Sequence, residues 1–362
     1  MMGIKHYFLD GNTSQGYVSF VGDVVDDINR IFLIKGSVRV EKSKVLKNIS
    51  EIFEKQNIDV HWLHNSTNDE LLDGIIIPQL SIAVLDGSNK SGVESKYKNF
   101  VEVEFDIDVA LDRVKLEVNK KAILKLIKDN DQFHKEAYAK FAKGKEIHEK
   151  KEELYISAMD FDKANKVIAQ IAANLYHDVR EETEKLIVKQ LFFGAGTSRG
   201  PINYIENITE DIKKRYIIKG RSGSGKSTLM RRIAKYGENL GLSVQYFPCG
   251  LDPNSLDMII IPTLSVAILD GTAPHIIDPT RETDEVIDMF ELCMDQSVED
   301  KYGKEFDLLH ESYKEVMKEG TQLLQEAKHI GHLLDELYQN ALDQMILKKE
   351  IDKILNTFKG LH

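Results

Sequence analysis

The sequence predicts an α/β protein made of two tandem halves, each a parallel sheet covered by helices and extended by a long helical arm. Two observations predict this architecture. An apolar segment of 13 residues occurs twice in the chain of 362. Beyond each copy, the apolar residues change from the continuous runs of buried strands to the spacing of helices.

The apolar segment that ends in Asp-Gly reveals the duplication. Residues 75–87 (IIIPQLSIAVLDG) recur as residues 259–271 (IIIPTLSVAILDG), with ten of the 13 positions identical. The two sets of numbers differ by 184, and the same difference brings Thr13 onto Thr197 and Gly36 onto Gly220. This gapless match predicts a tandem duplication with its boundary near residue 188.

The elements of the second half illustrate the order expected in both. A hairpin over residues 191–205 and a short helix come first, and a strand follows at 216–218. A helix over residues 227–239 and a strand at 242–247 precede the apolar segment, which we interpret as one more buried strand. The succession of strand, helix and strand predicts parallel pairing in a sheet covered by helices.

Long helical arms are expected to follow each sheet, because the sequence there is rich in Lys, Glu, Leu, Ile and Ala with apolar residues at helical spacing. We therefore divide the chain into a domain 1–188, with core 1–108 and arm 109–188, and a domain 189–362, with core 189–283 and arm 284–362. A difference of 175 aligns Tyr138, Asp160 and Asn165 with Tyr313, Asp335 and Asn340. This alignment predicts about nine extra residues between core and arm in the first half.

Composition and charge narrow the class of protein. The formal net charge of −11 argues against a dedicated nucleic-acid binder, which would carry a basic face. The apolar runs are too short to span a bilayer, and the first residues lack the apolar core of a secretory signal. Two distant cysteines, Cys249 and Cys293, indicate no disulfide framework. These features predict a cytoplasmic protein without a membrane partner.

Residues 220–227 (GRSGSGKS) match the phosphate-loop pattern G-x-x-x-x-G-K-[ST], between a β-rich run and a helix. The glycines allow consecutive amides to turn toward phosphate oxygens, and the start of the helix adds free N–H groups and its positive dipole end. The pattern predicts ATP and Mg²⁺ as cofactors. The candidate nucleotide-binding residues are Gly220, Arg221, Ser222, Gly223, Ser224, Gly225, Lys226, Ser227 and Thr228.

Two residues are candidate metal ligands. The Ser227 hydroxyl would bind Mg²⁺ directly, and Asp270, at the end of the apolar strand, would hold it through water. Lys226 would reach the β- and γ-phosphates. The alternative for Asp270 is an ordinary aspartate in a turn after a strand.

The first half provides an internal control. Its loop, residues 36–43 (GSVRVEKS), keeps Lys42 and Ser43 but has Arg39 and Glu41 in place of Gly223 and Gly225. A bulky residue does not easily adopt a positive φ, and a carboxylate at this place repels phosphate. We therefore predict that the first half does not bind a triphosphate productively.

The segment after Asp270 differs between the halves in the same way. Residues 272–281 (TAPHIIDPTR) correspond to residues 88–95 (SNKSGVES) of the first half, where the histidine and both prolines are missing. This parallel loss suggests that His275, Asp278 and Arg281 join Lys226 and Asp270 in the catalytic set. Arg281 would stabilise charge on a transferred phosphoryl group, and His275 or Asp278 would position water or an acceptor hydroxyl. The alternative is a rigid proline-containing turn.

Taken together, the fold class expected is two tandem P-loop NTPase-like parallel-sheet domains. Ile-Lys-Gly before the loop, the segment 251–257 (LDPNSLD) and the segment 270–279 (DGTAPHIIDP) resemble a bacterial family of tandemly duplicated P-loop proteins. These proteins are described as ATPases or nucleotide-kinase-like proteins without an established substrate. The resemblance implies an ATP-binding P-loop fold. The phosphate loop and the Thr-Ala-Pro-His element are both eroded in the first half of this chain, which argues against a mechanism with two sites.

Three functions remain open at this point. The leading hypothesis is an ATPase whose single site holds or moves the helical arms. A small-molecule or nucleotide kinase is the second, with Asp252, Asp257 or His275 near the acceptor, and a non-catalytic nucleotide-gated scaffold for a protein partner is the third. No glutamate follows Asp270, so the water-activating carboxylate of many ATPases is not evident in the sequence.

Overall fold

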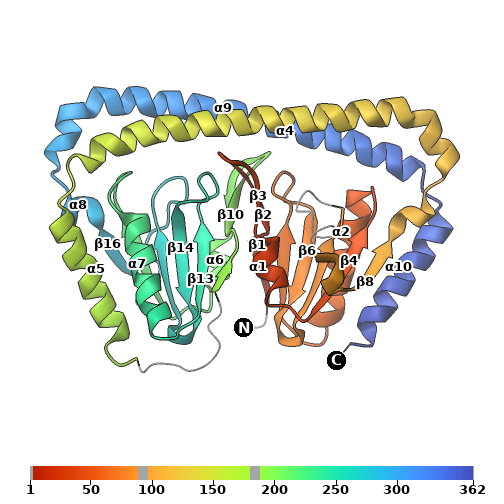
Figure 1. Cartoon of the computed structure of the whole chain (residues 1–362), viewed down its shortest axis with the longest axis horizontal. Coiled ribbons are helices and arrows are strands. Elements are labelled where there is room, and N and C mark those ends of the chain that lie inside the picture. The colour runs from red at the N-terminus through yellow and green to blue at the C-terminus, as the bar shows by residue number, and fades with distance from the viewer. Residues whose placement is uncertain (1–2, 89–96, 180–187, 362) are drawn as a thin grey trace.

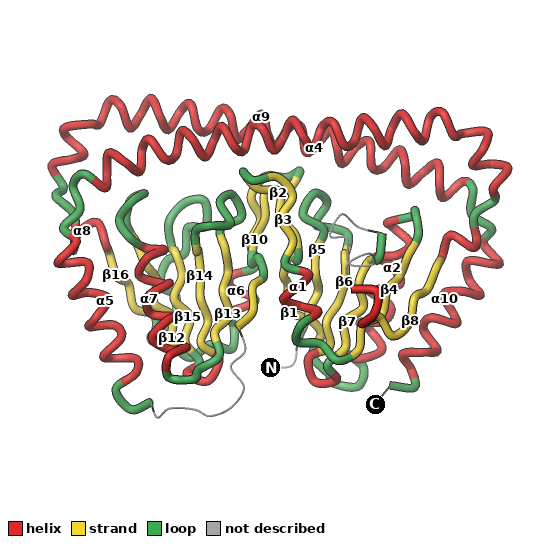
Figure 2. Tube along the Cα trace, viewed as in Figure 1, coloured by secondary structure: helices red, strands yellow, loops and turns green. Residues whose placement is uncertain are grey.

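The computed structural model describes residues 3–88, 97–179 and 188–361. Two sheet-and-helix halves lie side by side beneath two long helices that run the whole width of the molecule (Figure 1). The two sheets stand next to each other, and helices α5 and α10 lie on the two outer flanks (Figure 2). The tandem halves expected from the repeat are present as two similar α/β units.

The elements of the two halves correspond one to one along most of the chain. The first half contains β1 (Ile4–Phe8), β2 (Asp10–Thr13), β3 (Gly16–Ser19), α1 (Val21–Val25), β4 (Arg30–Lys35), α2 (Arg39–Glu54), β5 (Val60–His64), β6 (Leu72–Ile77), β7 (Ile82–Asp86), β8 (Val101–Asp106), α4 (Arg113–Ile156) and α5 (Phe161–Tyr176). The second contains β9 (Val188–Gln190), β10 (Gly194–Thr197), β11 (Gly200–Asn203), α6 (Ile205–Ile208), β12 (Lys214–Lys219), α7 (Lys226–Asn239), β13 (Val244–Pro248), β14 (Leu256–Ile261), β15 (Val266–Asp270), β16 (Glu285–Asp288), α8 (Met289–Cys293), α9 (Ser297–Asn340) and α10 (Gln344–Lys359).

Each half has a six-stranded sheet of mixed direction, so the prediction of parallel sheets is wrong in this respect. The strand orders are β1-β5-β6-β7-β4-β8 and β9-β13-β14-β15-β12-β16. β6 is antiparallel to β5 and β7, and β14 is antiparallel to β13 and β15, whereas the remaining neighbours pair in parallel.

The physical reason lies in the middle of the apolar segment. A single turn of 3₁₀ helix, Pro78–Leu80 or Pro262–Leu264, breaks the segment into two strands. Ser81 and Ser265 follow with left-handed φ values of 52° and 53°. This turn folds the segment back on itself as a hairpin, where periodicity alone predicts one strand.

The small hairpins expected at the start of each half are confirmed as β2–β3 and β10–β11. They stand where the halves meet (Figure 1). The backbone of Phe8 exchanges two hydrogen bonds with that of Phe192, at 2.9 and 3.0 Å. Both phenylalanine side chains are fully buried, so the halves share an apolar interface.

The arms form long helices as expected, but each crosses to the other half. We call α4 and α9 the strap helices; each has 44 residues and is therefore about 66 Å long. They run antiparallel to each other, and α4 carries the chain from the first half to the far side of the second (Figure 1). At that end, the backbone N–H of Asp160 donates to the carbonyl of Cys293 at 2.7 Å.

The helices beyond the straps complete the core of the opposite half. Ile168 and Ile171 of α5 pack in one cluster with Leu229 and Ile233 of α7. In the first half, the ring of Phe358 from α10 lies 5.0 Å from that of Phe32. The two halves have therefore exchanged their arms, and neither core is complete without the other half.

The straps also correct the internal alignment. Arg113 and Ile156, which bound α4, and Ser297 and Asn340, which bound α9, differ by 184 at both ends. The difference of 175 within the arms is therefore wrong, and no extra residues separate core from arm in the first half. A chance match of three polar residues misled the alignment, whereas the helix ends are set by the chain entering and leaving each sheet.

Candidate functional site

The loop between β12 and α7 has three glycines with left-handed φ values, as expected of the phosphate-binding nest that the sequence predicts. Gly220, Gly223 and Gly225 have φ values of 141°, 73° and 81°, a backbone region that residues with a side chain rarely adopt. Gly225 caps α7, so the loop ends on the N-terminus of a helix of 14 residues. The Ser224 hydroxyl is buried beneath the loop and has no hydrogen-bond partner among the described residues.

The same stretch of the first half has no nest. Only Gly36 has a comparable φ, 143°, and α2 already begins at Arg39, the counterpart of Gly223. Protein carboxylates take two of its amides: the N–H of Ser37 donates to Asp108 at 2.7 Å, and that of Arg39 donates to Asp335 at 3.1 Å. Where the second half has a glycine-containing loop, the first half, which lacks two of the glycines, therefore has a turn of helix.

The lysines at corresponding positions of the two loops, Lys226 and Lys42, also differ in their surroundings. Lys226 points back over the loop, with its Nζ 3.0 Å from the Arg221 carbonyl and 3.5 Å from Asp270 Oδ2. Its counterpart Lys42 is 2% exposed and lies 2.6 Å from Asp86 Oδ1. The first pair is longer and partly exposed, with side chains 11% and 18% exposed, whereas the second is a closed buried ion pair with side chains 2% and 6% exposed.

The candidate metal ligands lie on neighbouring elements, β15 and α7. Asp270 Oδ1 accepts hydrogen bonds from the N–H and hydroxyl of Thr272 at 2.9 and 2.6 Å. Ser227 Oγ accepts one from the N–H of Leu256 at 3.0 Å. The described residues hold no cluster of three or more His, Cys, Asp or Glu side chains fit for a metal ion. A cation here would thus depend on Ser227, Asp270, water and the phosphates of a ligand.

The segment after Asp270 is only partly at the loop. Lys219, the last residue of β12, donates to Asp278 at 2.8 Å, which puts this exposed carboxylate beside the entry to the loop. His275 is nearly buried against Phe193, and burial lowers the pKa of its imidazole to about 4. Its Nδ1 has no partner within the described residues. The first-half residues 89–95 used for this comparison lie outside the described part of the chain.

Arg281 does not lie at the phosphate loop. Its guanidinium donates to the carbonyls of Thr209 and Ile212, at 2.7 and 3.2 Å, near the start of β12. The phosphate loop follows the opposite end of that strand. The structure thus gives Arg281 a role in holding the chain around α6, because the segment 272–284 runs back along the strands from the carboxyl end of β15 to the start of β16.

Asp252 and Asp257 are both engaged within the protein. Lys145 of α4 lies 3.5 Å from Asp252 Oδ2. Burial and, to a smaller extent, the neighbouring Asp270 carboxylate together raise the pKa of Asp257 to about 7, against a hydrogen bond from Cys249.

The main feature missed in the sequence is that α4 of the first half covers the phosphate loop of the second. His148 Nε2 lies 2.9 Å from Ser222 Oγ. A Cβ added to Gly223 would stand 2.8 Å from the Glu152 carbonyl oxygen and 3.2 Å from Glu152 Cγ. Glycine at position 223 therefore serves two purposes, its positive φ and the close approach of the strap helix.

Arg221 connects the loop to the second strap helix. Its Nε donates to Glu299 Oε1 at 2.7 Å, and the hydroxyl of Tyr155 donates to the same oxygen at 2.9 Å. The guanidinium also stands over the ring of Phe290, 5.2 Å from its centre. The loop is thus joined to α4 and α9 together, through one shared carboxylate.

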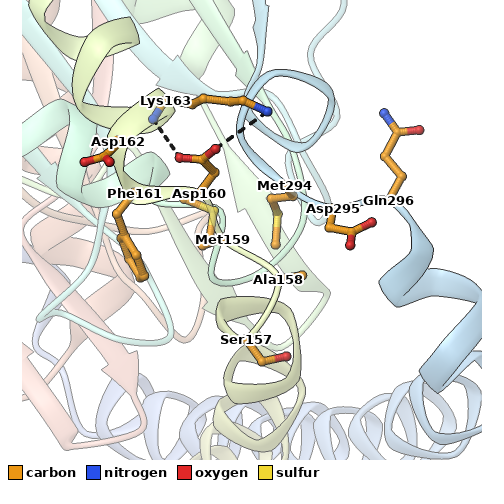
Figure 3. A pocket seen from close by; sticks show the side chains of 10 residues that line it. All are labelled: Ser157, Ala158, Met159, Asp160, Phe161, Asp162, Lys163, Met294, Asp295 and Gln296. Atoms are coloured by element: carbon orange, nitrogen blue, oxygen red, sulfur yellow. Dashed lines mark hydrogen bonds and ion pairs between the residues drawn. The ribbon is translucent and has the colours of Figure 1, made fainter.

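A cavity lies beside this junction, where α4 turns into α5 (Figure 3). Its lining includes Met159 and Asp160, and Asp160 is used by the backbone and the ammonium of Lys163. No residue of the phosphate loop lines this cavity. The cavity therefore lies at the bend between α4 and α5, and residues 220–227 do not contribute to it.

Comparison with known proteins adds no relative. The chain matches no protein-family model, and neither a curated protein nor a solved structure is similar to it. In the described part of the chain, no helix combines the length and the apolar character needed to cross a bilayer. Function must therefore be argued from the geometry of the loop and its surroundings.

Proposed function

We propose that the chain binds ATP with Mg²⁺ at residues 220–227 and hydrolyses it, at one working site in the second half. The observation that carries this proposal is the contrast between the two loops. In the second half, three glycines with positive φ precede a helix N-terminus, next to a partly exposed lysine and aspartate. In the first half, helix and protein carboxylates fill the same place.

The residues present fit the cofactors. The loop amides and α7 would hold the phosphates, Lys226 would neutralise the β- and γ-phosphates, and Ser227 and Asp270 would hold Mg²⁺. When bound, Mg²⁺ would polarise the phosphate oxygens and stabilise the negative charge that develops on them. The resemblance to duplicated P-loop ATPases is part of this proposal.

A kinase is less well supported than a hydrolase. The acceptor candidate Asp257 is enclosed beside Cys249, and Asp252 lies 3.5 Å from the Lys145 ammonium. Water is the acceptor that needs no further binding site, so hydrolysis is the simpler proposal.

The test is phosphate release from ATP and Mg²⁺, measured with and without a panel of small-molecule acceptors. We expect release that does not depend on an acceptor. If ADP forms only when an acceptor is present, the reaction is phosphotransfer and the proposal of hydrolysis is wrong. Tight ATP binding without any turnover would leave a nucleotide-gated scaffold instead.

A further inference from the structure

The strap helix α4 brings an unused carboxylate to the phosphate loop. Its neighbours on the helix are paired: Glu146 with Lys143 at 2.8 Å and Glu149 with Lys145. Glu152 makes no hydrogen bond or ion pair with any described residue, although its side chain packs against Gly223. Burial raises the pKa of Glu152, and the Lys226 ammonium opposes that rise, so the two charges are electrostatically coupled.

The gapless alignment shows that this feature is part of the repeat. With a difference of 184, His148 and Glu152 of α4 correspond to His332 and Glu336 of α9. A spacing of four residues places the histidine and glutamate of each pair on one face of their helix. The two strap helices therefore carry the same pair at corresponding positions of the repeat.

Only one of the two pairs meets an intact loop. His148 and Glu152 are partly buried against Ser222 and Gly223, whereas His332 and Glu336 are exposed. At that end of the strap, Arg39 pairs instead with Asp335, at 2.9 Å. The contacts of the His–Glu pair thus accompany the phosphate nest and are missing where the nest is missing.

We propose that Glu152, supplied by the first half, is the proton acceptor for ATP hydrolysis at the phosphate loop of the second half. This inference rests on the proposed function. The oxygen of a water molecule attacks the γ-phosphorus, and one of its protons passes to the Glu152 carboxylate. The bond between the γ-phosphorus and the bridging oxygen breaks, its electron pair stays on ADP, and Glu152 then loses the proton to solvent. His148, bonded to Ser222, holds the loop against the strap.

This arrangement supplies the carboxylate that is missing after Asp270. It also makes the active site a joint product of the two halves, so turnover requires the strap to be docked on the loop. The exchange of arms then has a functional consequence: the half that carries the loop lacks the group that activates water unless the other half supplies it.

The test compares Glu152→Gln with two matched variants, Glu336→Gln at the symmetric position and Glu149→Gln one turn earlier on α4. Each full-length variant is assayed for ATP turnover and for binding of ATP with Mg²⁺. We expect Glu152→Gln to lower kcat at least 100-fold while its Kd for ATP stays within about threefold of the wild type. The two matched variants should turn over ATP as the wild type does.

The outcomes separate the two proposals. Normal turnover by Glu152→Gln, in a protein whose turnover is lost with Lys226→Ala, would overturn the role of Glu152 and leave the ATPase intact. ATP binding without turnover by the wild type would also overturn it. Absence of ATP binding by the wild type would overturn the proposed function itself. A loss of turnover shared by Glu336→Gln would point to a structural effect of the straps and likewise contradict the inference.

Discussion

Replacing Lys226 with alanine is expected to weaken ATP binding by about 100- to 1000-fold, which corresponds to roughly 3–4 kcal/mol. The lysine lies over the loop, 3.0 Å from the Arg221 carbonyl and 3.5 Å from Asp270, whereas the guanidinium of Arg221, the other cation of the loop, pairs with Glu299 of α9. Its removal would leave the β- and γ-phosphates with the loop amides and Mg²⁺ only. Titration calorimetry with ATP and Mg²⁺ measures the effect directly.

The fold should survive this change, because Lys226 is in contact with carbonyl groups at the surface of the loop and its pair with Asp270 is long. Circular dichroism and the midpoint of thermal unfolding provide the control. ATP binding that is as tight in Lys226→Ala as in the wild type would refute the assignment of the loop.

Replacing Lys42 with alanine should have the opposite pair of effects: a less stable protein and an unchanged affinity for ATP. Lys42 and Asp86 are 2% and 4% exposed, and their charged atoms lie 2.6 Å apart. Removing the lysine leaves a buried carboxylate without its counter-charge, which typically costs about 3–5 kcal/mol. Trp62, the single tryptophan of the chain, lies in β5 of the same half and reports its unfolding by fluorescence.

A double variant, Lys42→Met with Asp86→Leu, is the matched control. Replacing both members of a buried ion pair with apolar side chains often restores much of the stability. The account predicts recovery in the double variant at constant ATP affinity. A large loss of ATP affinity in Lys42→Ala, with the protein still folded, would mean that the first half binds nucleotide after all.

The chemistry of the loop could be predicted because it is local. Gly220, Gly223 and Gly225 lie within six residues of one another, and their conformational freedom is a property of the residue type. The same holds for the defect of the first half, where Arg39 begins a helix instead. Local rules therefore predicted the difference in backbone conformation between the two loops.

Features that depend on distant parts of the chain could not be predicted in this way. The hairpin at Ser265 depends on a residue with a left-handed backbone conformation, which no apolar pattern predicts. Arg281 donates hydrogen bonds to carbonyls 69 and 72 residues earlier in the chain. The exchange of arms is equally invisible, because α5 would present the same apolar face to either sheet. The repeat does align Glu152 with a second glutamate of the chain, but only when the residue numbers of the two halves are taken to differ by 184.

The number of ATP molecules bound per chain tests the central claim most directly. Titration calorimetry of the full-length protein with ATP and Mg²⁺ should give one site per chain, retained in the folded Lys42→Ala variant and lost in Lys226→Ala. Two sites per chain, or one site that is lost equally in both variants, would contradict a single nucleotide site in the second half.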